Sequence, residues 1–317
     1  SSNGIGRATA VMFAKEGAMV TICGRDEKTS NETKTMVLLA NDNNEKKLFV
    51  VRGDLCKEEV MKETVDGTVR KFGRLDVLVN NAGGTGSSCW AEPEIEGDIS
   101  YFDYTMNLNT RSVLRLCQLA FPHLVKSQGE IVNVSSVTGL NNGASAPFPF
   151  YSISKAAQDQ LTRNLAMYYI KKGVRVNSVN PGIISTNIVQ RQGLSDEDVK
   201  QGEERIGASD SCVPCGRAGT PDEVAEAILF LADRFFMTTL SGFLLVVQRK
   251  RRPASTNGVR KSACMTPTIK QQRFNTAIQR KTATSANSTG KNIIEPATRS
   301  EELATIEGGF TEKNYWQ

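Results

Sequence analysis

The stretch Leu75-Asp76-Val77-Leu78-Val79, followed at once by Asn80-Asn81-Ala82-Gly83, decides the fold class of this chain. A short and almost continuous run of Leu and Val is typical of a strand that is buried on both faces of a parallel sheet. The small polar turn then lies at the carboxyl end of the strand, where sheets of this kind bind ligands. On these residues alone, a hydrogen-bonded turn without a ligand is an equally good interpretation.

Strand-like and helical patterns alternate on both sides of this stretch. Short apolar runs predict strands over residues 19–23, 47–52, 75–79, 130–134, 174–179 and 243–247. Helical periodicity predicts helices over residues 7–16, 25–41, 57–72, 104–126, 151–171 and 221–232. This alternation indicates a single Rossmann-type α/β domain, residues 1–247, in which helices cover both faces of a doubly wound parallel sheet.

The composition changes after residue 247. Residues 249–317 carry 13 Lys and Arg but only five Asp and Glu, and they are poor in aliphatic side chains. Such a segment cannot bury enough apolar area to offset chain entropy, so we expect residues 248–317 to form a basic, disordered tail. The run Arg249-Lys250-Arg251-Arg252 suggests nucleic-acid binding, but the few aromatic residues of the tail lie too far from it, and we do not expect such binding.

Several classes of protein are excluded by composition. No window offers about 18 consecutive apolar residues, so we expect no membrane-spanning helix. Seven cysteines without a regular spacing indicate free thiols in a reducing compartment, and we expect a cytoplasmic protein. A single histidine, His123, leaves neither a serine-hydrolase triad nor a set of metal ligands, so we expect no metal.

One group of residues is placed to bind a dinucleotide. Gly4-Ile5-Gly6 precedes a predicted helix, where glycines let the backbone approach a pyrophosphate. Arg25 follows the first predicted strand and favours the 2′-phosphate of NADP, whereas Asp26 leaves NAD open. Asp54 follows the next strand and is either an adenine ligand or a solvated side chain.

A second group is placed to transfer a proton. Tyr151 and Lys155 are four residues apart and share one helix face. An ammonium beside a phenol favours the phenolate and is expected to lower the pKa of Tyr151 from its usual value near 10. Ser136 follows a predicted strand, and its hydroxyl could stabilise charge on a substrate oxygen. Taken singly, Tyr151 and Lys155 are interpreted as a surface pair, and Ser136 as part of a turn or a helix cap.

In combination the motifs resemble the short-chain dehydrogenase/reductase family, in the branch that includes nematode enzymes. The resemblance covers about residues 1–247 and rests on Ser1-Ser2-Asn3-Gly4-Ile5-Gly6, Asn80-Asn81-Ala82-Gly83, Asn109, Ser136, Tyr151-x-x-x-Lys155 and Pro181-Gly182. It implies a doubly wound domain with a seven-stranded parallel sheet. It also implies a hydride transfer between a nicotinamide and a secondary alcohol or ketone, such as a steroid, retinoid, sugar or fatty-acyl derivative.

The resemblance assigns roles to individual residues. Tyr151 is the expected general acid or base, and Lys155 is its partner and a ligand of the nicotinamide ribose. Ser136 orients the substrate carbonyl, and Asn109 holds a water of the proton relay. The expected cofactor-binding residues are Ser2, Asn3, Gly4, Ile5, Gly6, Arg25, Asp54, Leu55, Asn81, Ala82, Gly83, Tyr151, Lys155, Pro181, Gly182 and Thr186. A lid over residues 188–217 and a homo-oligomer are also expected.

The chain departs from the family pattern at both ends. The family motif is Thr-Gly-x-x-x-Gly-x-Gly after a first strand, and here the strand, the threonine and the first glycine are absent. After residue 247 a basic run replaces the family's ending. We therefore expect a truncated chain with two exposed strand edges, because the first strand lies centrally in the sheet. A protein that keeps the fold for binding or regulation, without catalysis, is the alternative hypothesis.

Overall fold

The computed structural model describes residues 1–86, 94–140, 145, 148–186, 195, 197, 201–202 and 217–233, together with the backbone of 244–247. All of the described residues belong to one compact unit, Ser1–Pro253. The expected tail over residues 248–317 and nearly all of the expected lid over 188–217 lie outside the described residues.

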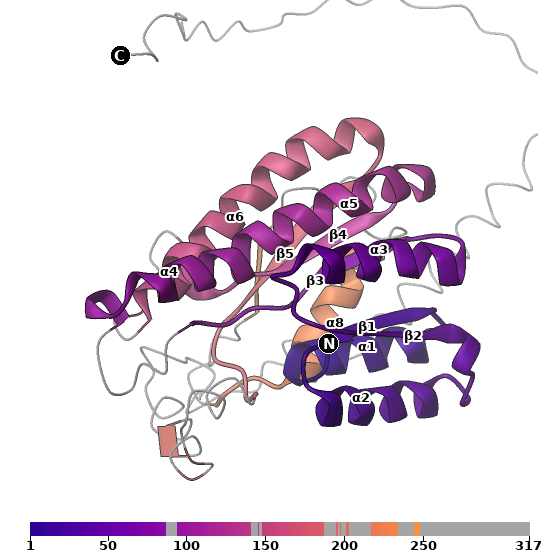
Figure 1. Ribbon diagram of the computed structural model, residues 1–317, viewed down its shortest axis with the longest axis horizontal. Coiled ribbons are helices and arrows are strands. Elements are labelled where there is room, and N and C mark those ends of the chain that lie inside the picture. The colour runs from indigo at the N-terminus through magenta and orange to yellow at the C-terminus, as the bar shows by residue number, and fades with distance from the viewer. Residues whose placement is uncertain are drawn as a thin grey trace, which may run out of the picture. The chain divides into compact units, whose positions relative to one another are not determined.

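The strands of the first unit form two parallel sheets (Figure 1). One sheet pairs β1 (Val20–Gly24) with β2 (Leu48–Arg52). The other has the order β3-β4-β5-β6, with β3 at Val77–Asn80, β4 at Glu130–Val134, β5 at Arg175–Pro181 and β6 at Leu244–Val247. Every predicted strand is present within two residues of its predicted bounds.

The two sheets are not joined by a strand ladder within the described residues. Strand β1 pairs only with β2, and β3 pairs only with β4, so each leaves one edge without a ladder partner there. The described residues therefore form a two-stranded and a four-stranded sheet, not the seven-stranded sheet implied by the family. This division leaves one open edge on β1 and one on β3, which are the two exposed strand edges expected from the sequence.

Helices cover both faces of the sheets (Figure 1). They are α1 (Gly4–Lys15), α2 (Glu27–Ala40), α3 (Glu58–Phe72), α4 (Ile99–Met106), α5 (Ser112–Ser127), α6 (Pro149–Tyr169) and α8 (Pro221–Ala232). One apolar core joins α3, α5 and α6 to β3, β4 and β5, and a second joins α8 to the opposite face of β4 and β5. Because side chains of one strand alternate between faces, β4 and β5 serve both cores.

Two helices differ from the predicted ones by more than two residues at one end. Helix α1 begins at Gly4 rather than Arg7, because the Asn3 side chain accepts the Gly4 N–H at 2.7 Å and caps it. The glycine turn is thus the first turn of the helix. The helix predicted over 104–126 begins at residue 99 and contains a π-helical segment, η3 (Asn107–Arg111), between α4 and α5.

Candidate active site

Four of the predicted cofactor residues meet where the glycine turn faces the strand ends. A methyl group placed on Gly6 would lie 2.5 Å from Asn81 Nδ2, and one on Gly4 would lie 3.1 Å from Thr186 Cγ2. These distances place the start of α1 against the turn after β3 and against the segment after β5. The first-turn N–H groups of a helix lack intrahelical partners, so this contact region fits a pyrophosphate.

The proton-transfer residues lie against the same turn. A methyl group on Gly83 would lie 3.1 Å from Lys155 Nζ and 3.2 Å from Asn109 Oδ1. The Lys155 ammonium in turn lies 5.6 Å from the centroid of the Tyr151 ring. The side chain of Ser136, which follows β4, lies close enough to the Tyr151 hydroxyl to act on its pKa. The four residues predicted to act on substrate are therefore brought together, although they come from three separate elements.

Lys155 is held from two sides. Its side chain is only 2 % exposed, and Nζ donates to the Val134 carbonyl and to Gln158 Oε1, each at 2.9 Å. Gln158 was not identified from the sequence, although it follows Lys155 by three residues and so shares its helix face. A buried ammonium with two fixed acceptors has a defined position, which is what a cofactor ligand requires.

The expected lowering of the Tyr151 pKa is not found. Burial raises the pKa of the Tyr151 phenol to about 12, and the nearby side chain of Ser136 opposes this only in part. Burial also lowers the pKa of Lys155 to about 8, against the opposing charge of Asp159. The prediction was wrong because the spacing of two residues contains no information on how strongly both are desolvated.

Asn109 lies in the π-helical segment and connects two parts of the site. Its Oδ1 accepts the Gly84 N–H at 2.9 Å, and its Nδ2 donates to the Gly84 carbonyl and to Ser154 Oγ, each at 2.8 Å. A π-helical turn widens the backbone and frequently marks a functional position. Both N–H donors of the side chain are used within the protein, so the expected relay water stays a prediction.

The adenosine end is more exposed. Arg25 is an exposed residue after β1, and its Nη1 donates to the Tyr104 hydroxyl at 2.8 Å. Asp26 Oδ1 caps helix α2 by accepting the Thr29 N–H at 2.8 Å. Asp54, beside Leu55, accepts the Cys56 N–H at 2.9 Å and orders the turn after β2. An exposed guanidinium beside an acid already engaged in capping suits a phosphate better than a ribose hydroxyl.

The part of the chain that the structure describes shows neither a metal centre nor a membrane span. No group of three or more His, Cys, Asp or Glu side chains there could hold a metal ion. None of the helices there is both long enough and apolar enough to cross a bilayer.

Comparison with known proteins places the chain in a family. The model of the family described as Enoyl-(Acyl carrier protein) reductase matches residues 1–246. An L-fucose dehydrogenase of Oryctolagus cuniculus is 36% identical over 245 residues, which are 77% of this chain and 81% of the relative. The 3-oxoacyl-[acyl-carrier-protein] reductase FabG of Thermotoga maritima is 34% identical over 235 residues, 73% of this chain and 87% of the relative.

Solved structures agree with this placement. A short-chain dehydrogenase/reductase from Caenorhabditis elegans with cofactor has a TM-score of 0.75 and 39% identity, and the match covers 78% of this chain and 90% of that one. ElxO with NADP bound has a TM-score of 0.65 and 31% identity, over 77% of this chain and 93% of that one. The chain therefore belongs to the short-chain dehydrogenase/reductase family, and it is an oxidoreductase that uses NAD(P) to move a hydride between nicotinamide and an alcohol or ketone.

Proposed function

We propose that the protein is an NADP(H)-dependent ketone reductase in which Tyr151 is the general acid, and the general base in the reverse direction. The observation that carries this proposal is the contact of Tyr151 with Ser136 on one side and with Lys155 on the other, next to Gly83. A pKa near 12 keeps the Tyr151 phenol protonated at neutral pH, which suits proton donation to a ketone oxygen.

Each residue has one task in the proposed mechanism. A nicotinamide held here would supply or take up the hydride. Tyr151 transfers its hydroxyl proton to the substrate oxygen, and the Ser136 hydroxyl donates to the same oxygen as negative charge develops on it. Lys155, fixed by Val134 and Gln158, holds the cofactor ribose and stabilises Tyr151 after the proton has left. Asn109 fixes the turn after Gly83 and orders the proton relay.

The proposed cofactor contacts follow the geometry of the site. Ser2, Asn3, Gly4, Ile5 and Gly6 surround the pyrophosphate at the start of α1. Asp54 and Leu55 face the adenine, and Asn81, Ala82 and Gly83 line the cofactor after β3. Pro181, Gly182 and Thr186 lie beside the nicotinamide, a proposal supported by the contact of Thr186 with Gly4.

The central test replaces Tyr151 with Phe. We expect Tyr151→Phe to lower kcat about 1,000-fold for any ketone that the wild-type protein reduces with NADPH, because the proton donor is lost. Tyr168→Phe is the matched control, since Tyr168 lies on the same helix and is 66 % exposed. The mechanism is wrong if Tyr151→Phe keeps wild-type turnover. NADPH binding without turnover of any ketone would instead favour the non-catalytic alternative.

NADP is proposed over NAD because of Arg25. We expect Arg25→Ala to raise the KM for NADPH by roughly tenfold or more and to leave the KM for NADH unchanged, since only NADPH has the 2′-phosphate. Arg74→Ala is the control, because Arg74 is exposed and pairs with Asp76 before β3 begins. Equal effects of Arg25→Ala on both cofactors would contradict the preference.

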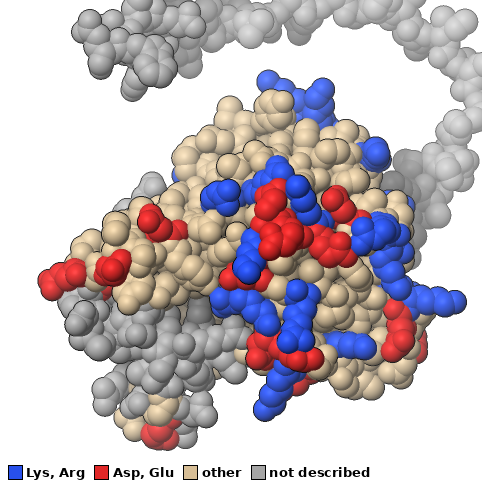
Figure 2. Space-filling model, in the orientation of Figure 1, with Lys and Arg blue, Asp and Glu red and all other residues tan. Residues whose placement is uncertain are grey.

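A second copy of this chain is the proposed partner besides substrate. Figure 2 shows acidic and basic side chains interspersed over α2 and α3, whereas the surface over α6 carries few charges. Met167 and Tyr168 of α6 are 73 % and 66 % exposed and would be covered in a homo-oligomer. Sedimentation of wild type and Met167→Glu tests this. The buried free thiols Cys23 and Cys117 support the proposed cytoplasmic location.

A further inference from the structure

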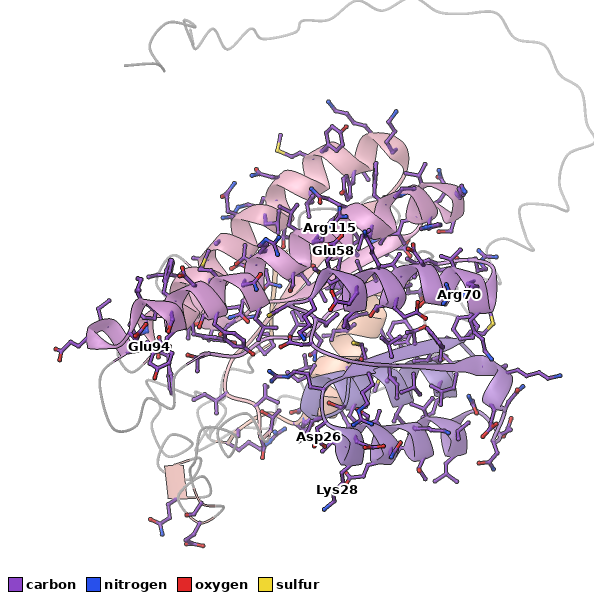
Figure 3. The ribbon with its side chains drawn as sticks, viewed as in Figure 1. Asp26, Lys28, Glu58, Arg70, Glu94 and Arg115 are labelled. Atoms are coloured by element: carbon purple, nitrogen blue, oxygen red, sulfur yellow. The ribbon has the colours of Figure 1, made fainter. Side chains whose placement is uncertain are left out.

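Glu94 is a buried carboxylate that the proposed mechanism does not use. It opens the short helix η2 (Glu94–Glu96), and its side chain is 1 % exposed. Figure 3 labels it beside α4. Its Oε1 accepts the Thr85 hydroxyl, and its Oε2 accepts the Phe150 N–H at 2.8 Å. A carboxylate is rarely buried this deeply without a specific task, because desolvation of its charge is costly.

One of these contacts caps the helix that carries Tyr151. Helix α6 starts with Pro149, which has no N–H, and its N-cap residue Phe148 makes no capping hydrogen bond through its side chain. Glu94 accepts the next N–H, that of Phe150, so the cap comes from 56 residues away in the chain. A negative charge at this end also stabilises the helix through its dipole. Tyr151 is the very next residue.

The packing around Phe150 fixes the same turn. The ring of Phe150 meets the ring of Phe102 edge to face, with centroids 5.4 Å apart. Phe102 belongs to α4, which continues through the π-helical segment that holds Asn109. The first turn of α6 is therefore held both by a charge-assisted hydrogen bond and by an aromatic contact.

The other contact of Glu94 reaches the turn beside the cofactor. Thr85 lies two residues after Gly83, in the segment whose Gly84 backbone is bonded to Asn109 and whose Gly86 N–H donates to Thr105 Oγ1 at 3.0 Å. A shift of this segment would thus be transmitted through Thr85 and Glu94 to Phe150. Hydride transfer needs donor and acceptor within a narrow range of geometry, and misplacement by about 1 Å can cost about a hundredfold in rate.

We propose that Glu94 is a positioning residue that couples the turn Asn81–Gly86 to the first turn of α6, so that Tyr151 is fixed relative to the bound nicotinamide. The inference rests on the proposed function of Tyr151. Glu94 does not touch the reacting atoms and acts through Thr85 and Phe150.

The test compares two substitutions of Glu94. Glu94→Gln keeps an acceptor for the Phe150 N–H and a donor for Thr85, whereas Glu94→Leu has a similar size and keeps neither. We expect Glu94→Leu to slow the single-turnover hydride step about 30-fold with NADPH, and Glu94→Gln to slow it by less than about fivefold. Single-turnover rates do not depend on how much of the enzyme is folded, so mere destabilisation would not change them.

A second readout needs no substrate. We expect NADPH to slow amide hydrogen exchange in the first turn of wild-type α6, because cofactor that orders the turn after β3 also orders Phe150 and Tyr151. Glu94→Leu should lose this protection while the Kd for NADPH changes less than about threefold, and Glu94→Gln should keep it. Glu58→Leu is the control, because Glu58 pairs with Arg115 on the surface (Figure 3); it should behave as wild type.

The outcomes separate this inference from the proposed function. Wild-type hydride rates and wild-type protection in a folded Glu94→Leu variant would overturn the coupling and leave the role of Tyr151 intact. If Glu94→Leu does not fold, Thr85→Val removes the hydroxyl that donates to Glu94. Its hydride rate and its hydrogen exchange are then measured instead. If NADPH binds but no ketone is reduced, the hydrogen-exchange measurement alone decides whether Glu94 couples the turn to α6. If neither NADPH nor NADH binds, the proposed function fails and the coupling with it.

Discussion

The two sheets of this protein differ in how deeply they are buried. Every residue of β4 and β5, in the larger sheet, is buried, whereas both strands of the smaller sheet, and β3 at the edge of the larger one, contain buried and more exposed positions. Strands β4 and β5 each pair with two strands and are covered on both faces, whereas β1, β2 and β3 each have one ladder partner among the described residues. Tyr151 and Lys155 belong to helix α6, which packs on this deeply buried part of the larger sheet, and Ser136 follows its strand β4. Arg25, which is proposed to select NADP, and Asp54, which is proposed to face the adenine, follow the two strands of the smaller sheet.

Buried polar side chains make the larger sheet specific as well as stable. Asn80 Nδ2 donates to Asn133 Oδ1 at 2.9 Å, and Asn133 Nδ2 donates to Thr162 Oγ1 at 2.9 Å, which joins β3, β4 and α6. Asn180 Nδ2 bonds both oxygens of Asp159, at 3.1 and 2.9 Å, and ties β5 to α6. These hydrogen bonds form only in the observed strand register. Any other register would leave buried amides unpaired, which is costly in free energy. The position of the helix that carries Tyr151 is thus set by three strands.

The largest effect on stability is expected from breaking the buried ion pair of the larger sheet. Glu130 and Arg175 lie opposite each other in β4 and β5, 3.2 Å apart with 5 % of each side chain exposed, and Arg175 also donates to the Leu231 carbonyl. We expect Glu130→Ala to lower the free energy of unfolding by about 3–5 kcal/mol, because it leaves a guanidinium in the core without its carboxylate. Urea unfolding measures this. A loss below about 1 kcal/mol would mean that water reaches Arg175.

The pH dependence of stability tests the burial of Lys155. Its folded-state pKa, about 8, lies below the ordinary value of 10.5, so between these values the unfolded chain binds more protons and stability rises with pH. From pH 8 to 10 the gain is on the order of 2 kcal/mol, and above pH 10 the raised pKa of Tyr151 begins to oppose it.

Lys155→Met is the variant that isolates this contribution. From pH 8 to pH 10 the unfolding free energy of wild type should rise relative to that of Lys155→Met. Lys171→Met is the control, because Lys171 is exposed in the 3₁₀ helix after α6. A pH-independent difference would show that Lys155 keeps an ordinary pKa.

The sequence predicts elements well where the signals are local. The helix expected over 221–232 is found at those residues, because Thr220 and Glu223 form a reciprocal cap around Pro221. The strand expected over 130–134 is likewise found at Glu130–Val134. The π-helical segment at Asn107–Arg111 was missed, because one extra residue in a turn hardly changes the apolar periodicity.

The site is predicted less completely because its contacts are distant along the chain. The family resemblance predicts that Tyr151, Lys155 and Ser136 lie together. The hydrogen bond between Glu94 and Phe150 spans 56 residues, and no local sequence pattern predicts it. The open edges of β1 and β3 were expected, because the resemblance puts a further strand between them in the sheet. The pKa of Tyr151 was predicted in the wrong direction, because its sign depends on burial, which only the packed structure reveals.

The smallest expected effect comes from the ion pair at the end of the smaller sheet. Glu27 and Arg52 are 2.8 Å apart, as close as many buried pairs, but 63 % and 60 % of their side chains are exposed. Water and salt therefore screen their attraction, and we expect Glu27→Gln to change the free energy of unfolding by about 0.5 kcal/mol or less. The residual effect should vanish in 1 M salt, where the screening length is about 3 Å, whereas the loss in Glu130→Ala should persist there. If Glu27→Gln were as destabilising as Glu130→Ala, burial would not be what separates the two sheets, and the shallower sheet would have to be as firmly held as the deeper one.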